Sequence, residues 1–269
     1  MIAILSRRLS LRQLPAPNRA ALLVERNIIL QRRGWPTVVS GFIEPVLYLL
    51  AIGFGVGALV GTSVVFDGRP LRYVVFVAPA MLASSAMNGA IYETSFNFFY
   101  KLKYVKLYDA VLATPLGVAD IALGEIFWAL TRGTLYAIGF LVVMAALGLI
   151  VSPWALLALP AAMLIGFSFA AVGTAASTFA RTWQDFDLVL TVLIPLFLFS
   201  ATFYPISVYP GPLQIVVQLT PLYHGVDLIR SLTTGAVGPS IVVDIVYLAI
   251  LGAVALAVAA TRLQRLLLK

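Results

Sequence analysis

Long apolar runs alternate with short polar segments along this chain, and the length of the runs predicts its main elements. A helix needs about 20 apolar residues to cross the hydrocarbon core of a bilayer. Six runs approach that length, at residues 37–60, 73–92, 127–147, 154–180, 188–206 and 241–261. We therefore expect an all-α integral membrane protein with six transmembrane helices. Residues 1–36 would form an N-terminal segment and residues 37–269 a single transmembrane domain.

Composition supports this fold class and excludes several kinds of chemistry. Hydrophobic residues make up 61% of the chain and charged residues only 11%, against roughly 25% charged in a soluble domain. The absence of cysteine and the single histidine exclude disulfides, cysteine nucleophiles and histidine metal clusters. No phosphate-binding loop of the form G-x-x-x-x-G-K-[ST] occurs either. No enzymatic centre and no cofactor is therefore expected in this chain.

The basic residues predict the orientation of the chain in the membrane. The net charge is +7, but the lysines and arginines lie at the ends of the apolar runs, which favours membrane anchoring over nucleic-acid binding. Fourteen of the 18 fall on the side of the two termini, three fall in the opposite loops, and Arg132 lies in the third run. Because positive residues remain on the cytoplasmic side, we expect a plasma-membrane protein with both termini in the cytoplasm.

Within the N-terminal segment, the stretch of residues 17–33 combines short apolar clusters with basic residues. Trp35, a residue type enriched at membrane interfaces, follows it. The segment is interpreted as an interfacial helix whose arginines meet lipid phosphates or a partner, the alternative being a solvated basic tail. The arginines concerned are Arg19, Arg26, Arg32 and Arg33.

Residues 100–112, between the second and third runs, predict an amphipathic helix on the cytoplasmic side. Lys103, Lys106 and Asp109 form its polar face. Such a helix could lie on the membrane or dock into a soluble partner, and the pattern leaves both open. The residues of the predicted docking surface are Tyr100, Tyr104, Val105, Leu107, Tyr108, Val111 and Leu112.

Residues 207–239 contain apolar pieces that are interrupted by proline and too short to cross a bilayer. They predict a re-entrant helical hairpin on the outer side, and a seventh span is the alternative. Within this region His224 is expected to be a hydrogen-bonded structural residue. Asp227 and Arg230, three residues apart, are expected to pair with each other.

Charged residues inside apolar runs are costly and each needs a partner or a role. Glu44, before Pro45, is interpreted as a lining or gating residue of a translocation path or as a paired structural carboxylate. Glu125 and Arg132, two helical turns apart and too distant to pair directly, are each expected to meet another helix or to snorkel, in a structural role rather than in contact with a substrate. Glu93 and Asp120 are expected to fix the geometry of the predicted cytoplasmic helix. Asp244 is expected to reach water at the outer end of the last span.

Several short motifs resemble one family of transporters. In the first run Gly41-Phe42-Ile43-Glu44-Pro45 is followed by Leu47-Tyr48-Leu49. The others are Tyr92-Glu93-Thr94, Asp120-Ile121-Ala122-Leu123-Gly124-Glu125 and Pro221-Leu222-Tyr223-His224. These motifs and the order of elements resemble the ABC-2 type permeases, and in particular their NodJ-like branch, whose founding members export lipo-chitin oligosaccharides.

The resemblance implies a function that the composition alone does not give. Such permeases have an N-terminal interfacial helix, a cytoplasmic coupling helix and external re-entrant helices, and they work with two separate ATPase subunits that bind ATP and Mg²⁺. A second permease subunit, identical or related, completes the complex. The expected function is export of an amphiphile such as a glycolipid, a lipid-linked saccharide or a hydrophobic drug. An ion-coupled secondary transporter and a membrane-embedded enzyme acting on lipid-linked sugars are the alternatives.

Overall fold

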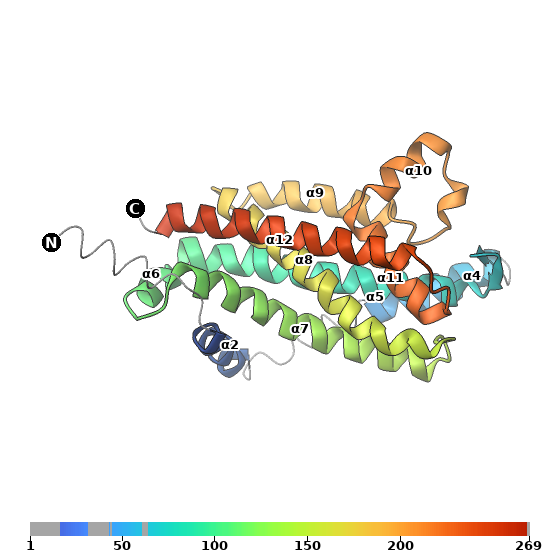
Figure 1. Cartoon of the computed structure of the whole chain (residues 1–269), viewed down its shortest axis with the longest axis horizontal. Coiled ribbons are helices and arrows are strands. Elements are labelled where there is room, and N and C mark those ends of the chain that lie inside the picture. The colour runs from blue at the N-terminus through green and yellow to red at the C-terminus, as the bar shows by residue number, and fades with distance from the viewer. Residues whose placement is uncertain (1–16, 32–42, 44, 61–63, 268–269) are drawn as a thin grey trace.

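A computed structural model describes residues 17–31, 43, 45–60 and 64–267 of the chain. Its long helices run side by side along the longest axis of the molecule (Figure 1). Four of them are long and apolar enough to cross a membrane, with bounds Tyr73–Tyr104, Val118–Ala146, Pro153–Phe179 and Ser240–Leu267. The described residues therefore form an all-α membrane protein with a single small hairpin of strands.

These long helices are built from the following elements. The first is α5 (Tyr73–Tyr92), which continues through the π-helical turns η2 (Glu93–Asn97) and η3 (Tyr100–Tyr104). The others are α7 (Val118–Ala146), α8 (Ala158–Phe179) with its preceding 3₁₀ turn η4 (Pro153–Leu157), and α12 (Ser240–Leu267). Two shorter apolar helices accompany them, η1 (Leu49–Val56) with α4 (Gly57–Val60), and α9 (Asp185–Leu198).

Smaller elements lie at the two ends of the bundle. At one end are α2 (Pro17–Gln31) and α6 (Leu107–Leu112), and at the other are α4, α10 (Gly211–Gln218) and α11 (Pro221–Thr234) (Figure 1). The turn η5 (Ile206–Val208) precedes α10. Strands β1 (Val64–Phe66) and β2 (Arg69–Leu71) pair in antiparallel fashion.

The β-hairpin was not predicted, although its turn carries a recognisable signal. Asp67 and Gly68 both have positive φ angles, 48° and 72°. An Asp-Gly pair with this backbone geometry connects two antiparallel strands without splaying them, because its twist matches that of the strands. The pair therefore predicts a hairpin where only a loop was expected.

Apolar burial divides into two clusters of unequal size. The larger cluster surrounds α5, the most buried of the long helices, and includes Phe76, Met87, Phe140 and Ile165. The smaller cluster lies at the end of the bundle that carries α2 and α6, and joins Leu23, Phe98, Tyr108, Ile121 and Leu263. By contrast, α12 exposes most of its apolar surface, as expected of a helix that faces lipid.

The helix bounds differ from the predicted runs in ways that affect the functional residues. The second helix does not end at Tyr92 but continues to Tyr104, and α7 begins at Val118, so that Asp120 and Glu125 lie inside it. The fifth run was predicted to extend to residue 206, whereas α9 ends at Leu198. A turn follows α9 in which Ala201 adopts a φ of 53°, and this backbone geometry does not continue a helix.

Candidate functional site

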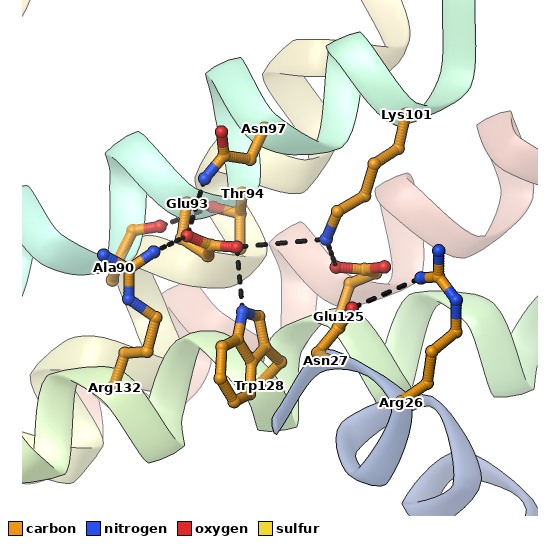
Figure 2. Close-up of polar contacts among 10 residues, drawn as sticks. All are labelled: Arg26, Asn27, Ala90, Glu93, Thr94, Asn97, Lys101, Glu125, Trp128 and Arg132. Carbon is orange, nitrogen blue, oxygen red and sulfur yellow. Dashed lines mark hydrogen bonds and ion pairs between the residues drawn. The ribbon is translucent and has the colours of Figure 1, made fainter. Parts of the chain in front are cut away.

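A layer of charged side chains crosses the bundle near the end that carries α2 and α6, and Glu93 is its centre. One carboxylate oxygen of Glu93 accepts a hydrogen bond from the indole of Trp128 at 3.0 Å. The other accepts from the amide of Asn97 at 2.8 Å and pairs with Arg132 (Figure 2). Glu93 is 4% exposed. Burial at this level is stable because both oxygens have partners and a cation faces the carboxylate.

Lys101 connects this centre to a second buried carboxylate. Its ammonium group lies 2.6 Å from Glu125 and 3.9 Å from Glu93 (Figure 2). Glu125 and Arg132, on the same helix α7, therefore meet partners on the α5–η3 helix, as the sequence predicts for residues two turns apart. In the part of the chain that the structure describes, the layer contains two carboxylates, Glu93 and Glu125, and two cations, Lys101 and Arg132, whose formal charges cancel.

Local helix geometry determines where the Glu93 side chain lies. Residues Glu93–Asn97 form a π-helical turn, a local widening that often occurs at functional sites. On the opposite side of this turn, α8 approaches closely at Gly173, where a β-carbon would lie 2.3 Å from the hydroxyl oxygen of Thr94. A side chain at position 173 would therefore displace the turn that carries Glu93.

A cavity of about 420 Å³ opens beside the charged layer. The helix Pro45–Leu59, α5, α7 and α9 contribute its walls. Glu93, Asn97 and Arg132 line one part of it. One carboxylate, that of Glu93, therefore contributes both to the wall of the cavity and to the ion pairs that lead to Lys101.

The predicted amphipathic helix at residues 100–112 is not continuous, and this is a correction. η3 ends at Tyr104, Lys106 adopts a left-handed backbone with φ 49°, and α6 begins only at Leu107. The predicted apolar face is consequently divided between two environments. Three of its residues are exposed, Tyr100, Tyr104 and Val105; two are buried, Tyr108 and Val111; Leu107 and Leu112 are partly buried.

The buried half of this segment is part of the smaller apolar cluster. The ring of Tyr108 packs against Phe98 with centroids 5.1 Å apart. Burial, and secondarily the nearby carboxylate of Glu125, raises the pKa of Tyr108 well above its ordinary value. Only the exposed half, Tyr100, Tyr104 and Val105, is available to a partner.

Sequence reasoning missed an aromatic contact between the end of η3 and the turn before α9. Trp183, in the turn before α9, stacks on Phe99 with centroids 5.7 Å apart and meets Tyr104 edge-on at 6.0 Å. In the same turn Asp185 accepts hydrogen bonds from the backbone N–H groups of Arg181 and Thr182, which lower the pKa of its carboxyl group. The exposed aromatic surface therefore includes a residue from another loop.

Helix α2 packs against α7 at the same end of the molecule. Its buried residues are Ala20, Leu23 and Asn27. The approach requires Gly124, where a β-carbon would lie 2.8 Å from Leu23. Arg26 is partly buried and donates to the side chain of Asn27 at 3.4 Å (Figure 2). The other three arginines of this prediction lie outside the described part of the chain. They are Arg19, of which the side chain is not described, and Arg32 and Arg33.

The remaining predicted residues have different outcomes. Asp120 accepts from the backbone N–H of Gly117 at 2.9 Å and so caps the start of α7. Among the described residues, Asp120 forms no hydrogen bond with segment 100–112. Glu44 lies outside the described residues, so its interpretation stays a prediction.

At the opposite end of the bundle, two predictions about charged residues need correction. Asp244 does not reach water: it is 3% exposed and lies 2.7 Å from the imidazole Nδ1 of His224. His224 is thus the hydrogen-bonded structural residue that was expected. Arg230 donates to the backbone carbonyls of Phe76 at 3.0 Å and Ala201 at 2.9 Å rather than to Asp227.

Comparison with known proteins agrees with the membrane fold and with the sequence motifs. A profile of the family described as "ABC-2 type transporter" matches residues 19–233. The chain is also similar to proteins named nodulation protein J. The one from Sinorhizobium fredii (strain NBRC 101917 / NGR234) is 33% identical over 86% of this chain and 87% of its own length.

Two further relatives of the same name show similar coverage. The protein from Rhizobium leguminosarum bv. trifolii is 34% identical over 78% of this chain and 79% of its own length. The protein from Rhizobium meliloti (strain 1021) is 32% identical over 74% of this chain and 75% of its own length. Members of the family are the membrane subunits of transporters driven by an ATP-binding cassette ATPase. This chain belongs to the ABC-2 type transporter family.

Proposed function

We propose that this permease forms an exporter for an amphiphile together with two ATPase subunits and a second permease subunit, identical or related. ATP and Mg²⁺ bind to the ATPases. The topology that goes with this proposal has six crossings, including the shorter helices Pro45–Leu59 and α9. Both termini are cytoplasmic, α2 lies at the membrane interface, and α10 and α11 form a re-entrant hairpin on the outer side. The asymmetry of lysine and arginine supports this orientation.

The observation that carries the proposal is the continuity between the exposed aromatic residues and the cavity. Tyr100 and Tyr104 are exposed on η3, and Lys101 on the same turn reaches inward to Glu125 and Glu93. Glu93 in turn lines the cavity. If an ATPase displaced η3, Lys101 would move with it. Because Lys101 contacts Glu93, this movement would reach a charged residue of the cavity wall.

This arrangement supports a mechanism in which helices move as rigid bodies. Closure of the ATPase dimer on ATP would displace η3 and the neighbouring Trp183. Lys101 lies between two carboxylates and could change partners without losing an opposite charge, which lowers the cost of such a movement in a dry environment. The cavity beside α5 and α9 would then open toward the outer leaflet.

The test changes the exposed tyrosines only. Tyr100→Asp combined with Tyr104→Asp should abolish ATP-dependent transport in proteoliposomes and weaken copurification of the ATPase, because charge replaces apolar contact area at a protein interface. Tyr204→Asp, which changes a half-exposed tyrosine in the segment before η5, is the matched control. Tyr108 is unsuitable for this purpose because it is buried, and its replacement would disrupt the fold.

Two outcomes would contradict the proposal. Normal ATP-dependent transport by the double variant would exclude the docking role of η3. Transport that continues without ATP and stops when an uncoupler is added would instead indicate an ion-coupled transporter.

A further inference from the structure

The cavity beside the charged layer has two walls of different chemistry. Polar side chains from α5 and α7 form one wall, among them Ser85, Asn88 and Tyr136. Apolar side chains from α9 form the other, among them Leu190, Ile194 and Phe197. A cavity of this kind matches a molecule with a polar head and an apolar tail, because each part is removed from water against groups of its own kind.

Among the described residues, the polar wall carries no uncompensated charge. Glu93 and Arg132 line the cavity as an ion pair, and the cation of Lys101 is held by Glu125 at 2.6 Å. A charged head would lose its hydration in this cavity without gaining a counter-ion, and an unpaired buried charge is strongly unfavourable. The wall therefore disfavours anionic and cationic heads alike.

Neutral hydrogen-bonding groups remain available on the same wall. The hydroxyl of Tyr136 accepts a hydrogen bond from Arg132 at 2.9 Å, so its own proton can be donated to a ligand. Ser84 donates to the carbonyl of Ala80 and keeps its oxygen lone pairs as acceptors. Donors and acceptors of this kind complement hydroxyl and amide groups.

We propose that each permease subunit binds the head of one amphiphile in this cavity, and that the charge-balanced wall selects an uncharged head rich in hydroxyl or amide groups. This inference rests on the proposed export function, which it makes more specific. The head lies between Asn88 and Tyr136, and the tail extends along α9 toward lipid. Selection against charge is a property of the Glu93–Arg132 pair.

The first experiment locates the site in the full-length chain reconstituted in phosphatidylcholine nanodiscs. Dodecyl maltoside with a diazirine at the end of its alkyl chain is photolysed, and labelled peptides are mapped by mass spectrometry. We expect labelling of α9 that excess unlabelled dodecyl maltoside suppresses. The double variant Ser85→Leu with Asn88→Leu should reduce this labelling by about tenfold, the effect of losing one or two hydrogen bonds. Thr261→Leu, on the exposed face of α12, should leave it unchanged.

The second experiment tests charge selection with probes of equal tail length. Dodecyl phosphate and dodecyltrimethylammonium should label α9 at least about tenfold less than dodecyl maltoside. Glu93→Gln leaves Arg132 without its carboxylate and should raise dodecyl phosphate labelling above that of dodecyl maltoside. Arg132→Gln should raise labelling by dodecyltrimethylammonium instead. Opposite shifts in the two variants cannot arise from a general loss of structure.

The outcomes separate this inference from the proposed export function. Equal labelling by the three probes, or the same change in both variants, would overturn the inference of charge selection. Labelling of α9 that no competitor suppresses would overturn the cavity as a binding site. Neither result depends on ATP or on the ATPase, so either could occur while the chain still functioned as an exporter subunit.

Discussion

The two ends of this permease bury charge in different ways. At the end that carries α2 and α6, cations face carboxylates from other helices, as Lys101 faces Glu125 and Glu93. At the end that carries α10 and α11, Arg230 is 2% exposed and donates hydrogen bonds to the backbone carbonyls of Phe76, Ala201 and Thr202. The guanidinium carbon also lies 3.8 Å from the centroid of the Phe76 ring. The charged layer uses side chains on both sides of each contact, whereas Arg230 is held by the fixed backbone.

This difference indicates where the molecule can change shape. An ammonium group between two carboxylates can move from one to the other while remaining paired. A guanidinium group that holds Phe76 and Ala201 through their carbonyls joins α11 to α5 and to the turn after α9, so that moving it would break contacts with two elements at once. We therefore expect movement at the charged layer and rigidity around Arg230.

The largest expected effect concerns Arg230. Arg230→Met should lower the free energy of unfolding by about 3 kcal/mol, because it removes several charge-assisted hydrogen bonds and an aromatic contact. Thermal unfolding of the purified chain in detergent measures the loss. Arg262→Met is the matched control: Arg262 donates to a carbonyl at 3.4 Å and stacks on Phe179 but is only partly buried. Similar losses in both variants would mean that Arg230 is not a special anchor.

A charge exchange sharpens the comparison at the other end. Lys101→Glu should destabilise the chain by about 3 kcal/mol and stop transport, because it gathers carboxylates in a buried layer. Adding Glu125→Lys should restore most of the lost stability and most of the transport, since opposite charges again face each other at this position. Unfolding temperature and ATP-dependent transport measure the two effects. If the double variant were as unstable and inactive as Lys101→Glu alone, the contact would depend on the exact side chains at positions 101 and 125. The charged layer would then be as intolerant of rearrangement as the site of Arg230.

The smallest effect tests how tightly α2 is held. Gly124→Ala should cost about 1–2 kcal/mol because its β-carbon would overlap Leu23 and push α2 away from α7. Gly133→Ala on the same helix meets no atom within 4 Å and should stabilise the helix by up to about 1 kcal/mol. Opposite signs in thermal unfolding would confirm the close contact. Stabilisation by both substitutions would show that α2 is not packed there.

The sequence predicted the apolar helices well because the requirement to satisfy the backbone inside lipid leaves a strong local pattern. The predictions failed where the outcome depends on contacts between distant residues. Nothing local in the sequence indicates that Glu93 meets Arg132, 39 residues away, or that Arg230 prefers carbonyls to Asp227. The break at Lys106 was missed because a left-handed residue leaves no signature in the spacing of apolar positions.

For the candidate site, most of the charged residues could be predicted from the sequence, but their arrangement could not. Glu93, Glu125 and Arg132 were singled out because charge is costly in apolar runs. Lys101 is one of the fourteen basic residues assigned to the side of the two termini, and it was not singled out because the second helix was expected to end nine residues before it. Asn88 and Tyr136 were not noticed, since uncharged polar residues are common in membrane helices and carry no signal until a cavity brings them together.

The length of the helix Tyr73–Tyr104 has a mechanical consequence. At about 1.5 Å per residue its 32 residues extend for roughly 48 Å, well beyond a hydrocarbon core of about 30 Å. The same rod that forms the cavity wall at Ser85 is thus too long to lie wholly inside such a core, and Tyr104 stands at its tip. Such a rod acts as a lever, and a push of a few ångströms at the tip would tilt the wall inside the membrane without any unfolding between them.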